Sequence, residues 1–157
     1  MMRRTTLILI LLIGIRTTCQ GQARSEVTVR IPAVAAFNVM DVSRPTPAAP
    51  FTIQFTNVKL LGQAKNLRLG VRAMASTFTP PNGPAMPASL VFWNTGAVQN
   101  GVGTPGTLTN TSFTTVFTST HNPKTASVVV LWNLAAPGPT IRAGAHALTV
   151  NWRIESF

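Results

Sequence analysis

Few side chains in this sequence are able to carry out acid–base or nucleophilic chemistry. The acidic residues are Glu26, Asp41 and Glu155, and the histidines are His121 and His146. Two of the acids fall on the outward phase of predicted strands near the chain ends, so the carboxylate pair of a glycosidase is not expected. Serines are abundant, but no Gly-x-Ser-x-Gly nucleophile elbow occurs. The sequence therefore predicts no catalytic residues and no enzyme activity.

The histidines also lack the partners that a metal site needs. His121 and His146 have no cysteine partner and no local acidic cluster, which leaves too few ligands for a closed zinc site. His146 falls on the inward phase of the last predicted strand, where we expect a core histidine bound to a backbone group. We predict no metal site and no cofactor.

Residues 1–23 have the pattern of a secretory signal peptide. Arg3 and Arg4 precede an apolar run, residues 7–13, and small or polar residues follow. The run is shorter than the roughly 20 apolar residues that span a bilayer. Cleavage after Gly21 or after Ala23 satisfies the small-residue rule. The site after Ala23 is the better match and leaves residues 24–157 as the mature domain. We expect a protein secreted to the periplasm or the cell surface, with no transmembrane helix in the mature chain.

Cys19, the sole cysteine, lies in this leader segment. A lipoprotein would keep it as the lipidated first residue, but Arg16 and Thr18 stand where such sites prefer an aliphatic and a small residue. After cleavage at Ala23 the domain has no disulfide, so burial of a core must hold it together.

The mature domain is strongly basic. Removal of the leader takes away Arg3, Arg4 and Arg16 and leaves ten basic against three acidic residues, a formal net charge of +7. Such a surface attracts anionic partners such as wall polymers, membrane surfaces or nucleic acid. The alternative is that the charge serves only solubility. Nucleic acid is the weakest of these partners, because the chain is exported and its basic residues are scattered.

Alternating apolar residues predict an all-β domain. The clearest case is the last predicted strand, in which apolar and polar residues alternate from Leu148 to Glu155. Just upstream, residues 128–134 are apolar on both phases, which predicts a central strand covered on both faces. Further strands are predicted over residues 26–31, 51–56, 67–74 and 89–93. About eight strands separated by Pro- and Gly-rich turns predict a single immunoglobulin-like or Greek-key β-sandwich.

Residues 94–117 give two further expectations. Residues 94–110, rich in Gly, Thr and Asn, are expected to form a long surface loop or a loose hairpin. Phe113 and Phe117, with Thr115 between them, are expected to point to the same side of the next strand.

The three tryptophans have two possible roles, in the core or in stacking on sugars. Trp132 and Trp152 are in phase with aliphatic neighbours, which favours the core. For Trp93 the sequence does not decide between these two roles. The absence of tyrosine weakens the sugar interpretation, because binding faces favour amphipathic aromatic residues.

One predicted strand carries a candidate basic stripe. Leu67, Leu69 and Val71 share one phase, so Arg68 and Arg72 project together from the opposite face. This pair is either a site for an anionic ligand or part of an ordinary solvated sheet face.

Near the C-terminus, an Ala-Gly pair at residues 143–144 precedes a strand that contains Trp152 and Ile154. This segment resembles the closing motif of the WxL domains of bacterial surface proteins. In that motif Ala-Gly is followed by an aromatic residue, an aliphatic residue and Trp-x-Leu. The matching positions are Ala143, Gly144, Val150 and Trp152, with His146 replacing the usual tyrosine and Ile154 standing in for leucine. A second Trp-x-Leu is formed by Trp132 and Leu134. The resemblance implies an exported, β-rich protein that attaches non-covalently to the cell wall.

The composition is also similar to that of bacterial fimbrial or pilin-like subunits, which are secreted, rich in Thr, Asn and Ala, and low in charge. Such subunits assemble by adding a strand from one subunit to the sheet edge of another. The candidate donor is the alternating segment Glu26, Val27, Thr28, Val29, Arg30 and Ile31, whose alternative role is an edge strand within its own domain. The cysteine pair and the penultimate tyrosine often found in chaperone-assembled subunits are absent.

These observations predict a non-enzymatic, exported bacterial surface protein with a structural or adhesive role and edge-strand assembly. Its partners would be other copies of itself or other surface proteins. The alternative is a cell-wall-binding module whose basic sheet face, with Arg68 and Arg72, holds an anionic wall polymer.

Overall fold

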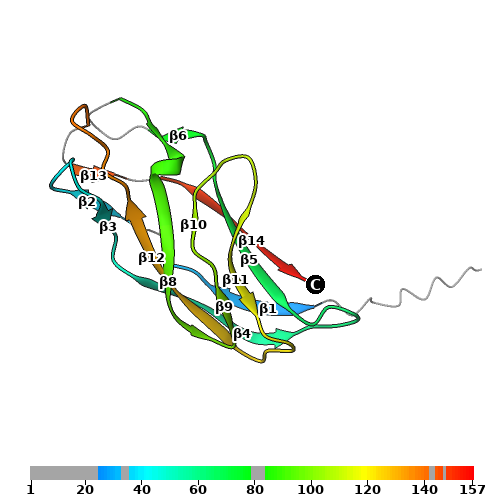
Figure 1. Ribbon diagram of the computed structural model, residues 1–157. Helices are drawn as coiled ribbons and strands as arrows, with labels where there is room; N and C mark the ends of the chain where they lie inside the picture. The colour runs from blue at the N-terminus through cyan, green and yellow to red at the C-terminus, as the bar shows by residue number, and fades with distance from the viewer. Residues whose placement is uncertain (1–24, 33–35, 79–83, 142–143, 147) are drawn as a thin grey trace, which may run out of the picture.

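The computed structural model describes residues 25–32, 36–78, 84–141, 144–146 and 148–157. The predicted leader, with Cys19, lies outside these residues. The described chain forms fourteen strands, several of them only two or three residues long, and one 3-10 helix, η1 (Ala88–Leu90). This architecture confirms the predicted all-β sandwich (Figure 1).

The larger sheet is antiparallel and has six strands. Its order is β1 (Glu26–Arg30), β4 (Phe51–Lys59), β12 (Ala126–Leu134), β8 (Val91–Gln99) and β10 (Gly106–Thr107), with β3 (Thr46–Pro47) also paired to β12. The predicted central strand is therefore correct, because β12 lies between β4 and β8. The prediction that both of its faces are covered is wrong, since Val129 and Leu131 on the outer face are only half-buried.

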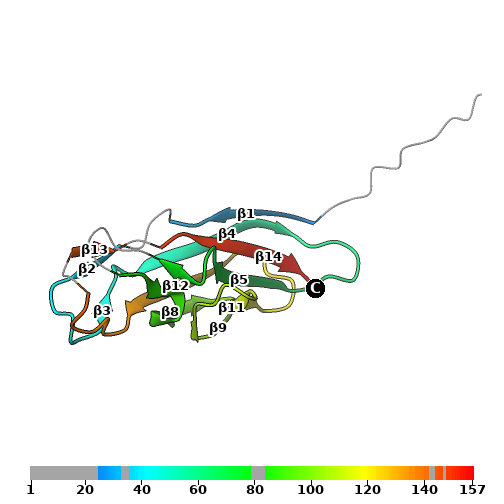
Figure 2. The same ribbon diagram turned by 90° about the horizontal axis from the view of Figure 1, so that it is seen from above.

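The second sheet has four strands. Its order is β14 (Val150–Ser156), β5 (Leu67–Ala73), β11 (Thr114–Ser119) and β9 (Gly101–Gly103). Two small sheets complete the fold, one formed by β13 (Gly144–His146) and β2 (Phe37–Val39) and the other by β6 (Thr77–Phe78) and β7 (Met86–Pro87). Figure 2 shows β1 and β14, which each end a sheet, along the same side of the molecule.

The core lies between the two main sheets and follows from period-two alternation. In β4 the side chains of Ile53 and Phe55 are fully buried, while the residues between and beside them are exposed. Leu69 and Val71 of β5 are fully buried in the same way. The rings of Phe55 and Phe117, from the two sheets, stack with centroids 5.3 Å apart.

The tryptophans join the two sheets. Trp93 and Trp132 are directly paired on β8 and β12, are 1 % and 3 % exposed, and have ring centroids 5.4 Å apart. Trp152 of β14 approaches Trp132 from the other sheet at 6.2 Å. Trp93 also donates a hydrogen bond from Nε1 to the Thr104 carbonyl oxygen at 2.8 Å. Trp93 and Trp132 therefore belong to the core, while Trp152, on an end strand, is half-buried beside it.

Of the two expectations for residues 94–110, the long surface loop is wrong, whereas the hairpin is found in part, because β10 returns to pair antiparallel with β8. Strand β8 runs on to Gln99, the chain turns at Asn100 with a φ of 54°, and β9 then joins the second sheet. The glycines of this segment serve close packing rather than looseness. A Cβ at Gly101 would collide with the Phe117 ring, and one at Gly106 would collide with the Trp93 ring. The Gly-rich composition of residues 94–110 was therefore misleading as a sign of a loop.

The expectation that Phe113 and Phe117 share a side is also wrong. The pairing of β11 with β5 shifts register between Thr115 and Phe117, as a β-bulge does. The extra residue reverses the phase, so Phe117 enters the core and Phe113 lies over the outer face of the sheet.

The C-terminal segment is not a single strand from His146 onward. Residues 144–146 form β13, whose partner is β2 in one of the small sheets, and the last strand begins only at Val150. His146 is opposite Phe37 in that register. Its predicted place on the inward phase of the last strand is therefore wrong.

Candidate ligand-binding face

Three arginines lie on the outer face of the four-stranded sheet. In the register of β14 with β5, Arg153 is opposite Gly70 and Glu155 is opposite Arg68. Directly opposed residues point to the same side of a sheet, so Arg153 shares its face with Arg68 and Arg72. Together with two aromatic rings they form what we call the arginine–aromatic face: Arg68, Arg72, Phe113, Arg153 and Phe157.

Each of these arginines packs on an aromatic ring. The guanidinium carbons of Arg72 and Arg153 lie 4.8 Å and 4.4 Å from the centroid of the Phe113 ring. Arg68 lies 4.4 Å from the centroid of the Phe157 ring. Such contacts attract a cation to the ring face and hold flexible side chains in place.

A glycine makes room for this arrangement. Gly70 occupies the outward position between Arg68 and Arg72, and the Cβ of Phe113 lies 3.2 Å from where a Gly70 Cβ would be. The missing side chain at Gly70 thus lets Phe113 lie against the sheet between the arginines. The bulge in β11 then separates Phe113 from the buried Phe117.

The face has a positive balance. Its acidic neighbour is Glu155, whose Oε1 lies 3.2 Å from Nε of Arg153. This pair is half-exposed and contributes little stability on its own. Nε of Arg72 is enclosed without a hydrogen-bond partner in the described part of the chain. Among the described residues, no carboxylate forms an ion pair with Arg68 or Arg72, so their charge is available to an anionic ligand.

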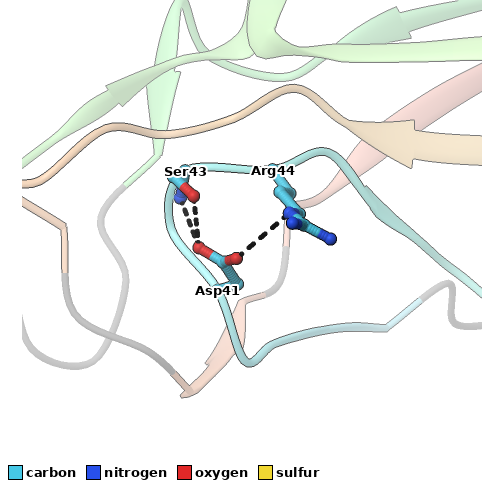
Figure 3. A network of polar contacts seen from close by, with 3 residues as sticks. All are labelled: Asp41, Ser43 and Arg44. Atoms are coloured by element: carbon cyan, nitrogen blue, oxygen red, sulfur yellow. Dashed lines mark hydrogen bonds and ion pairs between the residues drawn. The ribbon is translucent and has the colours of Figure 1, made fainter.

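The other two carboxylates are held by basic side chains away from this face. Glu26 Oε2 lies 3.4 Å from Lys59 Nζ on the outer face of the larger sheet. Asp41 Oδ1 accepts hydrogen bonds from Ser43 Oγ at 2.6 Å and Ser43 N at 2.9 Å, and Oδ2 lies 3.4 Å from Arg44 Nε (Figure 3). The hydrogen bond from the Ser43 hydroxyl, then that from its amide, lowers the pKa of Asp41 below its ordinary value. Asp41 is thereby kept ionised and is a poor proton donor.

The candidate donor segment and the two Trp-x-aliphatic motifs lie outside the arginine–aromatic face. Of the candidate donor segment Glu26–Ile31, residues Glu26–Arg30 form β1, which is paired with β4 of its own chain at the end of the larger sheet. The two Trp-x-aliphatic motifs meet across the sandwich, because Trp132 and Trp152 face each other. Leu134 is fully buried, whereas Ile154 is 36 % exposed because β14 ends its sheet. Across the described ranges, no three His, Cys, Asp or Glu side chains gather where they would hold a metal ion.

Sequence reasoning found Arg68 and Arg72 but missed Arg153, Phe113 and Gly70. Arg153 was visible as an outward residue of an alternating strand, yet nothing local reveals that β14 pairs with β5. Phe113 was hidden by the bulge. The Gly between the two arginines was the one available signal, because a glycine inside a strand marks close approach of another group.

No match to this chain is found among protein-family models, curated protein sequences or solved structures. Within the residues that the structure describes, no helix has the length and apolar character needed to cross a membrane.

Proposed function

We propose that this protein is a non-enzymatic, exported bacterial surface protein with a structural or adhesive role, whose copies associate through the edges of their sheets. The observation that carries the proposal is the pair of end strands, β1 and β14, on the same side of the sandwich. An end strand presents backbone groups that another chain is able to pair with.

The end strands lack some of the devices that block such pairing. Neither β1 nor β14 contains a proline. The ladder of β14 with β5 is free of bulges, whereas that of β1 with β4 shifts register once, between Glu26 and Thr28. Val27 and Val29 of β1 are only half-buried, so added chain would cover them further. Because β1 is already paired with β4, pairing at its free edge requires less rearrangement than its donation to another subunit.

Sedimentation of the exported protein tests this function. The full chain is expressed with its leader, the N-terminus of the recovered protein is determined by mass spectrometry, and pelleting is followed against protein concentration. We expect an N-terminus at Arg24 and pelleting of the protein alone. Retention of the leader in the cytoplasm would contradict export, and a protein that stays monomeric at every concentration would contradict assembly.

Deletion of Glu26–Ile31 examines the contribution of β1. The variant is expected to keep a β-type far-ultraviolet circular dichroism spectrum and to lose pelleting. Thr28→Ala is the matched control, since it changes an exposed side chain of β1 and leaves the backbone edge in place. Unchanged pelleting of the deletion variant would show that β1 has no part in assembly.

The arginine–aromatic face favours a second candidate function, binding of an anionic cell-wall polymer. Three arginines fixed on two aromatic rings, with one carboxylate among them, suit a ligand that carries repeated negative charges. Aromatic contacts reduce the side-chain entropy that binding would otherwise cost.

Co-sedimentation with isolated wall material tests this second function. We expect salt-sensitive binding that is weakened by the double variant Arg68→Ala with Arg72→Ala. The control is Arg30→Ala with Lys124→Ala, which removes the same charge from exposed positions outside this face. Equal weakening by both pairs would indicate net charge alone, and salt-insensitive binding would contradict the electrostatic mechanism.

A further inference from the structure

Among the strands that the structure describes, β14 has a neighbour on one side alone, so its other edge is free. It ends the four-stranded sheet, and β5 is its partner among the described strands. The ladder between them is regular, with residues 150–156 opposite residues 73–67 and no shift of register. Which backbone groups face outward can therefore be worked out from the hydrogen bonds at its two ends.

Odd-numbered residues of β14 bond to β5. Phe157 N donates to Asn66 O at 3.0 Å and Phe157 O accepts from Asn66 N at 2.9 Å. At the other end, Thr149 O accepts from Met74 N at 3.2 Å. Residues of an antiparallel strand alternate in the side to which their N–H and C=O groups point. The even-numbered residues, among them Trp152, Ile154 and Ser156, thus direct these groups to the free edge.

The side chains of β14 are complementary to themselves about Ile154. If a second copy pairs antiparallel with Ile154 opposite Ile154, then Arg153 lies opposite Glu155 of the second copy, and Glu155 lies opposite its Arg153. This register places the free backbone groups of Ile154 opposite each other, as hydrogen bonding requires. The two neighbouring registers with the same backbone phase would place Arg153 opposite Arg153 or Glu155 opposite Glu155, which is destabilising.

The chain already holds these charges in position. Arg153 and Glu155 form an ion pair at 3.2 Å, and Arg153 is also packed on Phe113. Pairing would give an alternating set of four charges on the outer face. On the inner face, Ile154, which is 36 % exposed, would be covered by Ile154 of the second copy.

We propose that β14 pairs antiparallel with β14 of a second copy, in the register centred on Ile154, to give a symmetric dimer with one continuous sheet. The proposal rests on the proposed edge-strand assembly and names the edge and the register. The contact is isologous, since the same residues are used by both copies.

Charge reversal tests the register. In the full-length exported protein, Arg153→Glu and Glu155→Arg are each expected to weaken dimerisation by about ten- to a hundredfold in sedimentation equilibrium, because like charges then face each other twice. The double variant Arg153→Glu with Glu155→Arg restores opposite charges and should dimerise as the original does. An equimolar mixture of the two single variants should form a heterodimer.

A cross-link tests the same contact without changing charge. Cα atoms of a hydrogen-bonded antiparallel pair lie about 5.5 Å apart, within the range of a disulfide. Ile154→Cys in a Cys19→Ser background should therefore form a disulfide-linked dimer on mild oxidation. The control is Val102→Cys in the same background, a site that is 67 % exposed at the opposite end of the sheet.

Amide exchange gives a third, backbone readout. Amides of Asn151, Arg153 and Glu155 should be protected at every protein concentration, whereas those of Trp152 and Ile154 should gain protection only as the dimer forms. Dimers that are insensitive to both charge reversals, or that cross-link through Val102, would overturn this inference while leaving assembly itself intact. A protein monomeric at every concentration would overturn both, and wall binding would still be measurable on it.

Discussion

Replacing two neighbouring tryptophans by phenylalanine should have very different costs. Trp93 and Trp132 are directly paired, nearly equally buried and in contact, so Trp93→Phe and Trp132→Phe remove the same atoms from one layer of the core. The cavity term should therefore be similar in the two variants. What differs is the indole N–H: Nε1 of Trp93 donates to Thr104 O, whereas Nε1 of Trp132 is enclosed without a partner in the described part of the chain.

The difference can be estimated from these two donors. Trp93→Phe loses a hydrogen bond with a net value of about 1 kcal/mol. Trp132→Phe removes a buried donor whose lack of a partner costs about 1–3 kcal/mol. The free energy of unfolding should thus be about 2–4 kcal/mol lower for Trp93→Phe than for Trp132→Phe.

Urea denaturation followed by far-ultraviolet circular dichroism measures this difference without depending on tryptophan fluorescence. Equal m-values would show that both variants unfold from a comparable native state. If Trp132→Phe were as destabilising as Trp93→Phe, or more so, the assignment of a satisfied and an unsatisfied indole would be refuted.

Two further predictions concern the backbone and pH. Gly101→Ala should destabilise the fold by about 1–3 kcal/mol, because its Cβ meets the Phe117 ring and the Thr118 carbonyl. Gly96→Ala should cost less than about 1 kcal/mol, since the nearest neighbour of its Cβ is Val129 Cγ1 at 3.3 Å. Thermal denaturation of both variants measures this difference. Asp41→Ala should lower stability at neutral pH. Because the pKa of Asp41 is lowered by folding, that difference is present above the ordinary value of 3.8 and disappears as the pH falls through the lowered pKa, which denaturation across pH 2–7 measures. A difference that grows on acidification would contradict it.

The local alternation of apolar and polar residues was sufficient to predict the strands but not which strands pair with each other. Strands β4, β5 and β12 were predictable because one phase of each is almost wholly apolar and does become buried. Strand β8 was recognised only in its first part, since its second half carries Asn, Thr and Gly. The second half of β8 is a strand because it pairs with β12. That pairing joins segments distant in sequence, so no local sequence pattern reveals it.

The same distinction explains the candidate site. Arg68 and Arg72 lie four residues apart on one strand, which is two periods of its alternation, so the sequence alone predicts that they share a face. Arg153 joins them only through the pairing of β14 with β5, and Phe113 only through the bulge in β11. The exposure of Ile154 likewise depends on which strand ends the sheet, which alternation does not specify.

The two proposed surfaces meet at Arg153, and this overlap gives a test of whether they act together. Antiparallel pairing about Ile154 places the arginine–aromatic faces of both copies on the same side of the continuous sheet, because opposed residues share a face. A repetitive anionic polymer would then engage two faces at once, with the gain that multivalency brings.

Glu155→Arg separates charge from pairing. It removes one negative and adds one positive charge, which raises the net charge of the face by two, so a monomeric electrostatic site would bind isolated wall material more tightly at low salt. It also places Arg153 opposite an arginine of the second copy, so a site that depends on the dimer would bind more weakly. We expect weaker binding by Glu155→Arg, together with the loss of dimers in sedimentation equilibrium. Tighter binding by Glu155→Arg would show that the face works as a single unit and that the dimer serves assembly alone.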